Sequence, residues 1–599
     1  MKNFINTLKS LKYLIGFSIK HCPQMLIIDG LFGAVVALST VLFIIMPKMI
    51  LSAAMHQSET KHIVLLILIF ALGELFCQYM LSFFSELSSI YNEKMAHDML
   101  LALSEKATRI DYSDIKSNAL IEKYQHAQNV SFQLNLYTAQ LFCDFFSNFI
   151  KIITVIAVIS TISIWMVGII LVIVFLKLIV ADRIKQRDVS FQIEADKINV
   201  HYNYTVMLAG HLDFAKEMRC YGAENFIKHK FSEARTRRIA NESKKLRFHN
   251  RMTILEHLLD TASVAVGYAM IVARYLKGAI EISMFTMYLT AIIETYVTVA
   301  ELLRVIVNLN DTNRLLEQYM SFLQYPEKIW SSGTLKEIPK QSDGSFIFEF
   351  KNVSFRYPDT EQYALRDLNV TFRLGDRIGI IGENGAGKST FVKLLLRLYD
   401  VDEGEILLNG INIRQLDYNT YLRLFSVVPQ DFALFYFSVQ ENVGFERFAD
   451  EKEKIERVLA DVDLLEKLRS LPNGLRSYTS KWFQNGVDFS GGERQRIAIA
   501  RAFFREAPIM VLDEPSAAID PLAEEQIHQA INAVSIDKLV IHISHRLSMT
   551  KACNQILVFQ NGSIIEKGSH QELMEQNGIY HQLFEMQAQY YVQEKEAEA

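Results

Sequence analysis

The sequence predicts an α-helical, membrane-spanning first half followed by an α/β second half. Three observations carry this prediction. Apolar stretches of spanning length fill the chain up to about residue 305. Near Tyr325-Pro326 the hydrophobic density falls, and from Ser345 short apolar runs alternate with glycine turns. A glycine-rich turn at 382–389 then stands between a strand pattern and a helix pattern. At 599 residues the chain is also too long for one ordinary domain.

Six apolar stretches in the first half are long enough to cross a bilayer as helices. The third and fourth are separated by only a few residues around Ile162, and Leu276-Lys277-Gly278 joins the fifth and sixth. The loop Leu51–Lys61 is also short. A buried, soluble all-α domain does not explain so many runs of this length. The predicted spans cover approximately 24–50, 62–86, 137–160, 163–181, 253–275 and 279–305.

The other connections in this half are long and basic, and residues 182–251 are the clearest case. The positive-inside rule places these connections and both termini in the cytoplasm. Because they keep helical periodicity, we expect the spans to continue as helices beyond the bilayer. We therefore expect a multi-pass protein of a bacterial plasma membrane, in contact with membrane lipids. The basic residues of this segment include Arg183, Lys185, Arg187, Lys216, Arg219, Arg235, Arg237, Arg238, Lys244, Lys245, Arg247 and Arg251.

Composition excludes other classes of protein. Half of the chain is hydrophobic, only 22% is charged, and the net charge of −5 gives no reason to expect nucleic acid as a partner. The five cysteines lie far apart without metal-like spacing, so we interpret them as buried apolar residues. No stretch at the N-terminus resembles a cleavable signal peptide.

The expected domain boundaries follow these changes of pattern. We predict a transmembrane domain over 1–325, a linker over 326–344, a nucleotide-binding domain over 345–588 and a polar tail over 589–599. Serine, glycine and proline residues mark the linker.

The glycine-rich turn has the spacing G-x-x-x-x-G-K-[ST], directly after the apolar run 377–381. A strand that turns through glycines into a helix directs backbone N–H groups and the helix N-terminus at phosphates, and the lysine reaches the β- and γ-phosphates. The sequence therefore predicts that a nucleoside triphosphate binds here, and the resemblance described below implies that it is ATP. The predicted binding residues are Gly382, Asn384, Gly385, Gly387, Lys388, Ser389 and Thr390.

A second motif completes this chemistry. The apolar run from Pro508 ends in two carboxylates, Asp513 and Glu514. Asp513 would bind Mg²⁺ together with the hydroxyl of Ser389, and Glu514 would act as the general base toward the attacking water.

Between these motifs, Phe489-Ser-Gly-Gly-Glu-Arg-Gln-Arg496 resembles the signature of ATP-binding cassette transporters, Leu-Ser-Gly-Gly-Gln followed by x-Gln-Arg. The sequence departs from it at Phe489 and Glu493, whereas the phosphate-contacting Ser490, Gly491 and Gly492 are intact. In this family the signature closes on the nucleotide that the opposite subunit holds, so the resemblance implies a dimer.

Four further residues match functional elements of the family. Tyr357 matches the aromatic that stacks on adenine, although an ordinary strand-end tyrosine is the alternative. Gln430 matches the residue that senses Mg²⁺ and the γ-phosphate, Asp520 the loop that joins two sites across the dimer, and His545 the γ-phosphate switch. We interpret His542 as structural. Because every catalytic position is present, a homodimer with two equivalent sites is the simplest assembly.

The resemblance covers essentially the whole chain and implies an exporter, in which six spans are fused to one cassette and two chains form the transporter. In the family, two cytoplasmic turns transmit force, and they would lie near 111–117 and 212–219 here. Solvated helix connections are the alternative for both segments. Closure of the cassettes on ATP would open the cavity outward, and hydrolysis would reset it.

The substrate is predicted least directly. Lys481-Trp-Phe-Gln-Asn-Gly486 resembles exporters of bacteriocins and lanthionine-containing peptides, whereas many multidrug and lipid exporters carry glutamate at position 484. We therefore expect export of a hydrophobic or cationic peptide. A lipid or drug exporter is the alternative, and a scaffold for peptide-modifying enzymes is a more remote one. Because the first span begins near residue 24, we expect no leader-peptidase domain.

Three carboxylates at membrane depth bear on this choice. Glu74, Asp144 and Glu294 would line an acidic cavity suited to cationic peptides. The alternative is that they lie near span ends or pair with Lys151 and similar groups.

Overall fold

The computed structural model divides the chain into two compact units, which are described separately. One unit comprises residues 1–106 and 122–324, and the other comprises 107–121 and 325–599. The structure describes residues 12–13, 15–115, 117–160, 164–210, 214–338, 346–358, 360–515, 521–544 and 547–586.

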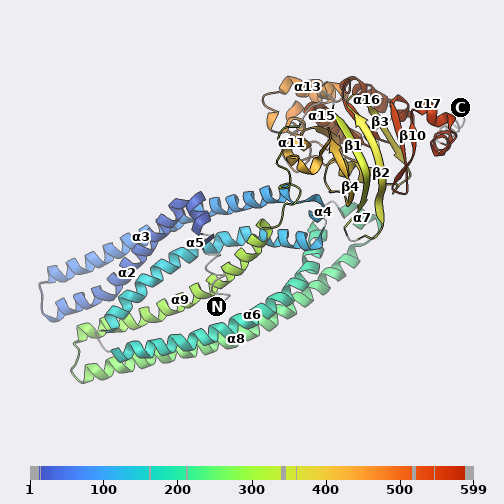
Figure 1. Cartoon of the computed structure of the whole chain (residues 1–599). Helices are drawn as coiled ribbons and strands as arrows, with labels where there is room; N and C mark the ends of the chain where they lie inside the picture. The colour runs from blue at the N-terminus through green and yellow to red at the C-terminus, as the bar shows by residue number, and fades with distance from the viewer. Residues whose placement is uncertain are drawn as a thin grey trace. The chain divides into compact units, whose positions relative to one another are not determined.

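The first unit is a set of long helices that run alongside one another (Figure 1). α3 has 50 residues and α8 has 53. At about 1.5 Å per residue these helices exceed 70 Å, whereas the hydrocarbon core of a bilayer measures about 30 Å. The predicted helical extensions beyond the membrane are therefore confirmed. The long helices of this unit are α2 (Pro23–Met55), α3 (Thr60–Arg109), α5 (Asn118–Ser160), α6 (Ile164–Gly210), α8 (Glu224–Leu276) and α9 (Ile282–Leu323).

Among the described residues, four helices are apolar and long enough to cross a membrane, within 23–55, 60–109, 224–276 and 282–302. Their large apolar side chains face outward, as at Leu72 and Leu75, which are 63% and 67% exposed. Such exposure suits a lipid environment. The predicted third and fourth spans fall on α5 and α6, where the side chains of many residues lie outside the described set, so the count of six stays a prediction.

Charged groups within these helices are paired with one another. The ammonium of Lys177 on α6 forms an ion pair with Asp260 on α8, and the two side chains are 5% and 11% exposed. Lys177 also lies 5.1 Å from the ring centroid of Tyr296. Lys151 pairs with Glu301 at 3.1 Å. Charges buried at membrane depth require such partners.

The carboxylate of Glu74 likewise accepts hydrogen bonds from the hydroxyl of Ser39, at 3.0 Å to each oxygen. Glu294 lies close enough to Lys151 for an electrostatic interaction between the two side chains. An acidic cavity lined by Glu74, Asp144 and Glu294 stays a hypothesis, and these contacts favour the alternative of local pairing.

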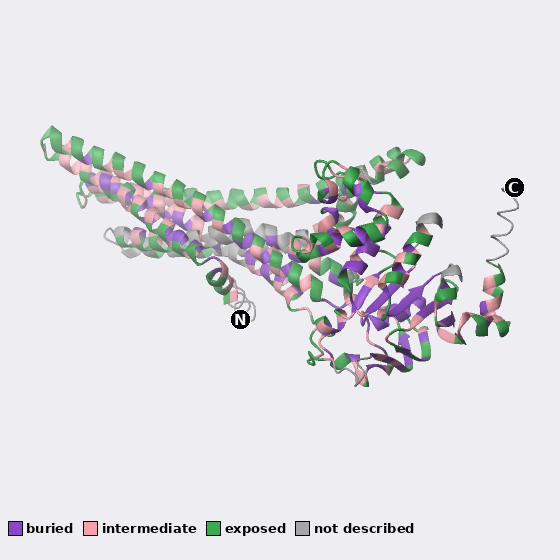
Figure 2. Cartoon of the chain, turned by 90° about the horizontal axis from the view of Figure 1, so that it is seen from above, coloured by how far each residue is buried: buried purple, intermediate pink, exposed green. Residues whose placement is uncertain are grey.

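The second unit contains two sheets. A four-stranded sheet has the order β2-β1-β4-β5, and its paired strands are antiparallel. The strands of this four-stranded sheet are β1 (Ile347–Arg356), β2 (Tyr363–Arg373), β4 (Glu403–Leu408) and β5 (Ile411–Asn412). Figure 2 shows the strands of the second unit as the most buried part of the chain.

The six-stranded sheet has the order β10-β9-β3-β8-β7-β6, in which every pair except β10–β9 is parallel. All residues of β7 and β8 are buried, as expected for apolar strands with both faces covered. The fold class predicted for both halves is thereby confirmed. The strands are β3 (Arg377–Gly382), β6 (Phe425–Val428), β7 (Ile509–Asp513), β8 (Leu539–Ile543), β9 (Gln555–Gln560) and β10 (Ser563–Gly568); among the helices of this unit are α10 (Lys388–Leu395), α14 (Leu465–Ser470), α15 (Gly491–Arg505), α16 (Pro521–Val534) and α17 (His570–Glu575).

The strand register determines where the site forms. Ile543 of β8 lies beside Ile380 of β3 on one side and beside Asp513 of β7 on the other. The carboxyl ends of β3 and β7 therefore open at the same edge of the sheet, where ligands bind in open α/β sheets.

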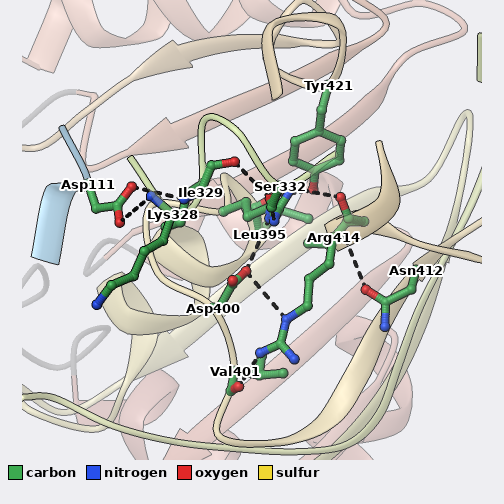
Figure 3. A network of polar contacts seen from close by, with 12 residues as sticks. Asp111, Lys328, Ile329, Ser332, Leu395, Asp400, Val401, Asn412, Arg414 and Tyr421 are labelled. Atoms are coloured by element: carbon green, nitrogen blue, oxygen red, sulfur yellow. Dashed lines mark hydrogen bonds and ion pairs between the residues drawn. The ribbon is translucent and has the colours of Figure 1, made fainter. Parts of the chain in front are cut away.

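The turn predicted near 111–117 belongs to this second unit and contains the short helix α4 (Tyr112–Ile115). The two carboxylate oxygens of Asp111 accept hydrogen bonds from the backbone N–H groups of Lys328 and Ile329, at 3.2 and 3.0 Å (Figure 3). Asp111 is 5% exposed. The turn is thus fastened to the linker through its side chain.

The linker is in turn fastened to the sheet domain. The fully buried guanidinium of Arg397 donates to the hydroxyl of Ser332 at 2.6 Å, and the ring of Trp330 packs on Tyr418 at 5.5 Å. The backbone N–H of Leu335 also donates to the carbonyl oxygen of Gln415 at 3.1 Å. The second predicted turn contains α7 (Ala215–Cys220) in the first unit.

Candidate nucleotide site

The glycine-rich turn joins the end of β3 to the start of α10. Gly382 and Gly387 have positive φ angles of 150° and 106°. A Cβ at Gly382 would lie 2.3 Å from the carbonyl oxygen of Phe559, and one at Gly387 would lie 2.7 Å from Leu365. Only glycine satisfies both restrictions. The sequence thus forces a loop whose backbone wraps around the N-terminus of α10, a geometry suited to phosphate.

Lys388 is the first residue of α10 and its side chain turns back over the loop. Its ammonium donates hydrogen bonds to the carbonyl oxygens of Gly382 at 2.7 Å and Glu383 at 3.0 Å. Burial lowers the pKa of this ammonium, and the nearby carboxylates of Glu514 and Asp513 act in the opposite direction. Among the described residues its hydrogen bonds go to these two neutral carbonyls, so this buried cation suits a polyanionic ligand.

Asp513 ends β7 and is 7% exposed. Burial and the neighbouring Glu514 raise the pKa of its carboxyl group to about 6, against the opposing charge of Lys388. Its Oδ1 atom has no hydrogen-bond partner among the described residues. A buried carboxylate oxygen of this kind fits a ligand to a hard cation such as Mg²⁺, which retains waters and phosphate oxygens as its other ligands.

Glu514 follows in a strained backbone conformation with φ of 50°. Its N–H donates to the carbonyl oxygen of Ile543 at 3.0 Å, and its own carbonyl accepts from the side chain of Gln495 at 3.2 Å. The amide of Gln430 donates to its carboxylate at 3.3 Å. Neighbouring strands and α15 therefore fix the direction in which this carboxylate points.

Tyr357 directly follows β1. Its hydroxyl lies 2.9 Å from the hydroxyl of Thr390, and the ammonium of Lys393 donates to it at 3.2 Å. The ring packs against Phe355 and Tyr399, with centroids 5.2 and 5.4 Å away. A half-buried aromatic fixed beside the glycine-rich turn provides a face on which a base could stack.

Most of these residues line one cavity of about 660 Å³, whereas Gly382 and Asp513 do not belong to its lining. The structure therefore brings together residues predicted from motifs that lie far apart in sequence. The lining includes Tyr357, Asn384, Gly385, Gly387, Lys388, Ser389, Thr390, Gln430 and Glu514.

Some residues that line the cavity were not predicted from the sequence. Arg366, Asn561 and Gly562 also line the cavity, and the backbone N–H of Arg366 donates to the carbonyl of Gly562 at 2.9 Å. The Asn561-Gly562 pair is a strong hairpin-turn signal, which predicts a turn but not its place beside the phosphate loop. Gln495 was also missed as a support of Glu514.

The signature residues are not part of that lining. Ser490 caps α15, and a capping box joins it to Glu493: its N–H donates to Glu493 Oε2 at 2.9 Å, and the N–H of Glu493 donates to its hydroxyl at 3.4 Å. Ser490 and Gly491 are exposed, whereas Gly492 is half-buried. Two further predicted residues, Asp520 and His545, lie outside the described residues.

The environment of His542 supports the prediction that this residue has a structural role. It is buried in β8, and burial lowers the pKa of its imidazole to about 4. A neutral buried histidine at this position acts as part of the core.

Comparisons with known proteins agree with this geometry. The family profile described as ABC transporter matches residues 365–517. The subtilin transport ATP-binding protein SpaT of Bacillus subtilis is 33% identical over 385 residues, which cover 62% of this chain and 61% of SpaT. The ATP-dependent lipid A-core flippase of Salmonella paratyphi A is 30% identical over 435 residues, or 71% of each chain.

The fold also matches a solved structure over nearly its full length. A bacterial Atm1-family ABC exporter with ATP bound superposes with a TM-score of 0.80, covering 95% of this chain and 98% of that one at 20% identity. At this identity the likeness concerns the fold. Together with the two relatives and the cavity that β3, α10 and β7 form, it shows that this chain belongs to the family of ATP-binding cassette exporters.

Proposed function

We propose that the chain is an ATP-hydrolysing exporter that moves a peptide out of the cytoplasm and works as a homodimer. One observation carries the proposal: the cavity holds Lys388, Gln430 and Glu514, yet Ser490 and its two glycines lie outside its lining. A γ-phosphate bound at Lys388 would therefore lack the signature unless another chain supplied it. A second copy has that helix N-terminus exposed and available.

The chemistry follows from the positions of these side chains. Lys388 would exchange its carbonyl partners for phosphate oxygens, and Tyr357 would stack on adenine. Glu514 would accept the proton of the attacking water, and Gln430, already bonded to it, would orient that water. Mg²⁺, bound by Ser389, Gln430 and Asp513, would neutralise phosphate charge. Asp520 and His545 are proposed to complete the site, at the dimer-joining loop and the γ-phosphate.

Movement would pass from the cassette to the helices through the two cytoplasmic turns. The turn at Asp111 is fastened to the linker by two hydrogen bonds, which makes it a stiff connection to the sheet domain. ATP-driven closure of two cassettes would then change the packing of the long helices, and hydrolysis would reverse it. We place the termini and both turns on the cytoplasmic side of a bacterial plasma membrane.

A peptide substrate is supported by SpaT, whose name assigns it to the transport of subtilin, a peptide. The segment 481–486 supports it as well, because Gln484 stands where many lipid and drug exporters carry glutamate. A lipid flippase is the second candidate, since the Salmonella relative matches a larger share of the chain.

Reconstitution separates these candidates. The full-length chain in inside-out vesicles is given ATP and Mg²⁺ with a cationic lanthionine-containing peptide, and peptide uptake is measured beside the flipping of a fluorescent lipid. We expect ATP-dependent peptide uptake. Lipid flipping without peptide uptake would favour the flippase.

Lys388→Ala is the inactive control, because it removes the phosphate-binding ammonium. Lys452→Ala is the matched control, at a lysine whose side chain is 68% exposed. Uptake that persists in Lys388→Ala would contradict an ATP-driven exporter. A scaffold for peptide-modifying enzymes would retain enzyme binding in that variant and transport nothing in either form.

A further inference from the structure

The signature helix of this chain carries an ionised carboxylate next to its phosphate-facing end. Glu493 stands where the family signature has glutamine, and its side chain is 12% exposed. One oxygen, Oε2, accepts from the backbone N–H of Ser490. Burial by itself would raise the pKa of this carboxyl group, but bonds to Lys467 and Ser490 lower it below its usual value. The group is therefore charged at neutral pH.

A negative charge at this place conflicts with phosphate binding. The N-terminus of α15 attracts anions through its N–H groups and the helix dipole. A carboxylate within the first turn supplies its own negative charge there and would repel a triphosphate that approaches Ser490. A neutral glutamine could make the same bond to Ser490 without that repulsion.

Lys467 removes the conflict. It lies on α14, and its ammonium forms an ion pair and hydrogen bond with Oε1 of Glu493, the oxygen that the cap does not use. Each carboxylate oxygen thus has its own donor. The nearby guanidinium of Arg496 bonds instead to the carbonyl of Asp463 at 2.8 Å. Lys467 is therefore the cation that these contacts assign to Glu493.

The same arrangement orients the signature serine. The hydroxyl of Ser490 accepts the N–H of Glu493 and also bonds to the carboxylate of Glu493, so its proton would turn from that carboxylate to a phosphate oxygen when ATP binds. If Glu493 rotated away from Ser490, the cap would be lost and the hydroxyl would no longer be fixed. The ion pair with Lys467 opposes that rotation.

We propose that Lys467 is a positioning residue of the ATP site, which neutralises Glu493 and holds it in the capping geometry so that Ser490 can bind the γ-phosphate of the partner's ATP. This inference rests on the proposed dimeric ATPase. It applies to chains with a carboxylate at this signature position, because glutamine needs no counterion.

The test uses steady-state ATPase kinetics of the full-length chain in lipid nanodiscs. Lys467→Ala should raise KM for ATP about tenfold and change kcat much less, because the lost interaction acts on nucleotide capture. The defect should shrink at high ionic strength as the repulsion is screened. Lys467→Arg should restore KM. Lys452→Ala, which removes an ammonium paired with Glu456 within the helix Lys452–Asp461, should have no effect.

The decisive variant is the double change Lys467→Ala with Glu493→Gln. Glu493→Gln provides the reference background, in which the added Lys467→Ala should have no further effect on KM. An equal loss in both backgrounds would overturn the proposal, because it would show that Lys467 only fastens α14 to α15. An unchanged KM in Lys467→Ala would overturn it as well.

Failure of the proposed function would look different. In that case the unmodified chain would not hydrolyse ATP, or Ser490→Ala would leave hydrolysis intact. A hydrolysing chain that depends on Ser490 but is indifferent to Lys467 would refute only the role of Lys467.

Discussion

The buried charges of the two units are arranged in opposite ways. In the helical unit Lys177 and Asp260 face each other as a closed ion pair, and Lys151 pairs with Glu301. In the sheet unit the ammonium of Lys388 donates its hydrogen bonds to neutral carbonyls, with the carboxylates of Glu514 and Asp513 nearby, and one oxygen of Asp513 accepts no hydrogen bond among the described residues. The first arrangement satisfies charge within the protein, whereas the second leaves bonding capacity for a ligand.

This difference teaches where to look for function in each unit. A buried ion pair with matched partners mainly joins helices, and its net contribution to stability can be small. Buried ionisable groups without an oppositely charged partner destabilise the folded chain when no ligand is bound. They are typical of functional sites, where the binding of a ligand offsets this cost. The following experiments test this contrast, from the largest expected effect to the smallest.

Glu514→Gln is expected to have the largest effect. It removes the proposed base but keeps the bond from Gln430, so ATP should still bind while hydrolysis falls at least about a hundredfold. Single-turnover hydrolysis and nucleotide trapping by the full-length chain measure both quantities. Near-normal hydrolysis would contradict the assignment of the base.

Lys177→Ala tests the closed pair in the helical unit. It leaves the buried carboxylate of Asp260 without its cation and should lower the free energy of unfolding by about 3–5 kcal/mol. The double change Lys177→Met with Asp260→Leu should recover most of this loss. Denaturant unfolding in micelles provides the measurement.

The matched control for that experiment lies on the same two helices. Lys244 on α8 pairs with Glu194 on α6 at 3.7 Å, with both side chains more than half exposed. Lys244→Ala should change stability by less than about 1 kcal/mol. If Lys177→Ala is equally mild, the pair does not join the helices.

Asp111→Ala tests the fastening of the first turn to the linker. It leaves the N–H groups of Lys328 and Ile329 without their acceptor and should destabilise the second unit by about 2 kcal/mol. Hydrogen exchange of these amides should accelerate, and calorimetry should show a lower unfolding temperature for the second unit. Asp488→Asn, at a side chain 71% exposed, is the control and should change neither.

The pH dependence of Mg²⁺ binding tests the open arrangement at Asp513. With its pKa raised to about 6, this carboxyl is protonated below pH 6, so apparent Mg²⁺ affinity in the presence of ATP should fall about tenfold per pH unit there. Calorimetric titration at several pH values measures it. Asp513→Asn should abolish the pH dependence, and a dependence that survives must come from another group.

The raised pKa of Asp513 also affects stability, but in the opposite direction: Mg²⁺ binding weakens as pH falls, whereas the stability of the ligand-free chain decreases as pH rises. The folded carboxyl binds its proton more tightly than the unfolded one, whose value is 3.8, so stability without ligand should fall as pH rises from about 4 to 6. Bound Mg²⁺ should remove this loss. The charges that face Asp513 and enter this balance are those of Glu514, Lys388, Lys393 and Asp431.

Much of the fold could be predicted because its signals are local. Long apolar runs predict helices of spanning length, and the G-x-x-x-x-G-K-[ST] spacing requires the strand, turn and helix found at β3 and α10. Domain boundaries are less certain, because contacts rather than composition place residues 107–121 with the second unit.

The site was predicted where each residue belongs to a motif, as for Lys388, Gln430 and Glu514. Residues that act through contacts had no such signal. Lys467 is one of many lysines in the sequence. Asp111 was expected only as part of a turn, whereas its carboxylate bonds to a linker more than two hundred residues away.

The sequence by itself therefore determined the two halves of this protein, the phosphate loop and the identity of its chemical groups, because short-range spacing encodes them. Only the tertiary structure decided which groups meet. The register of β3, β8 and β7 places Asp513 at the same sheet edge as the glycine turn, and helix packing brings Lys177 against Asp260. A buried charged side chain stabilises the fold or binds a ligand according to the partner that the tertiary structure places next to it. Because that partner is distant in sequence, no local pattern predicts it.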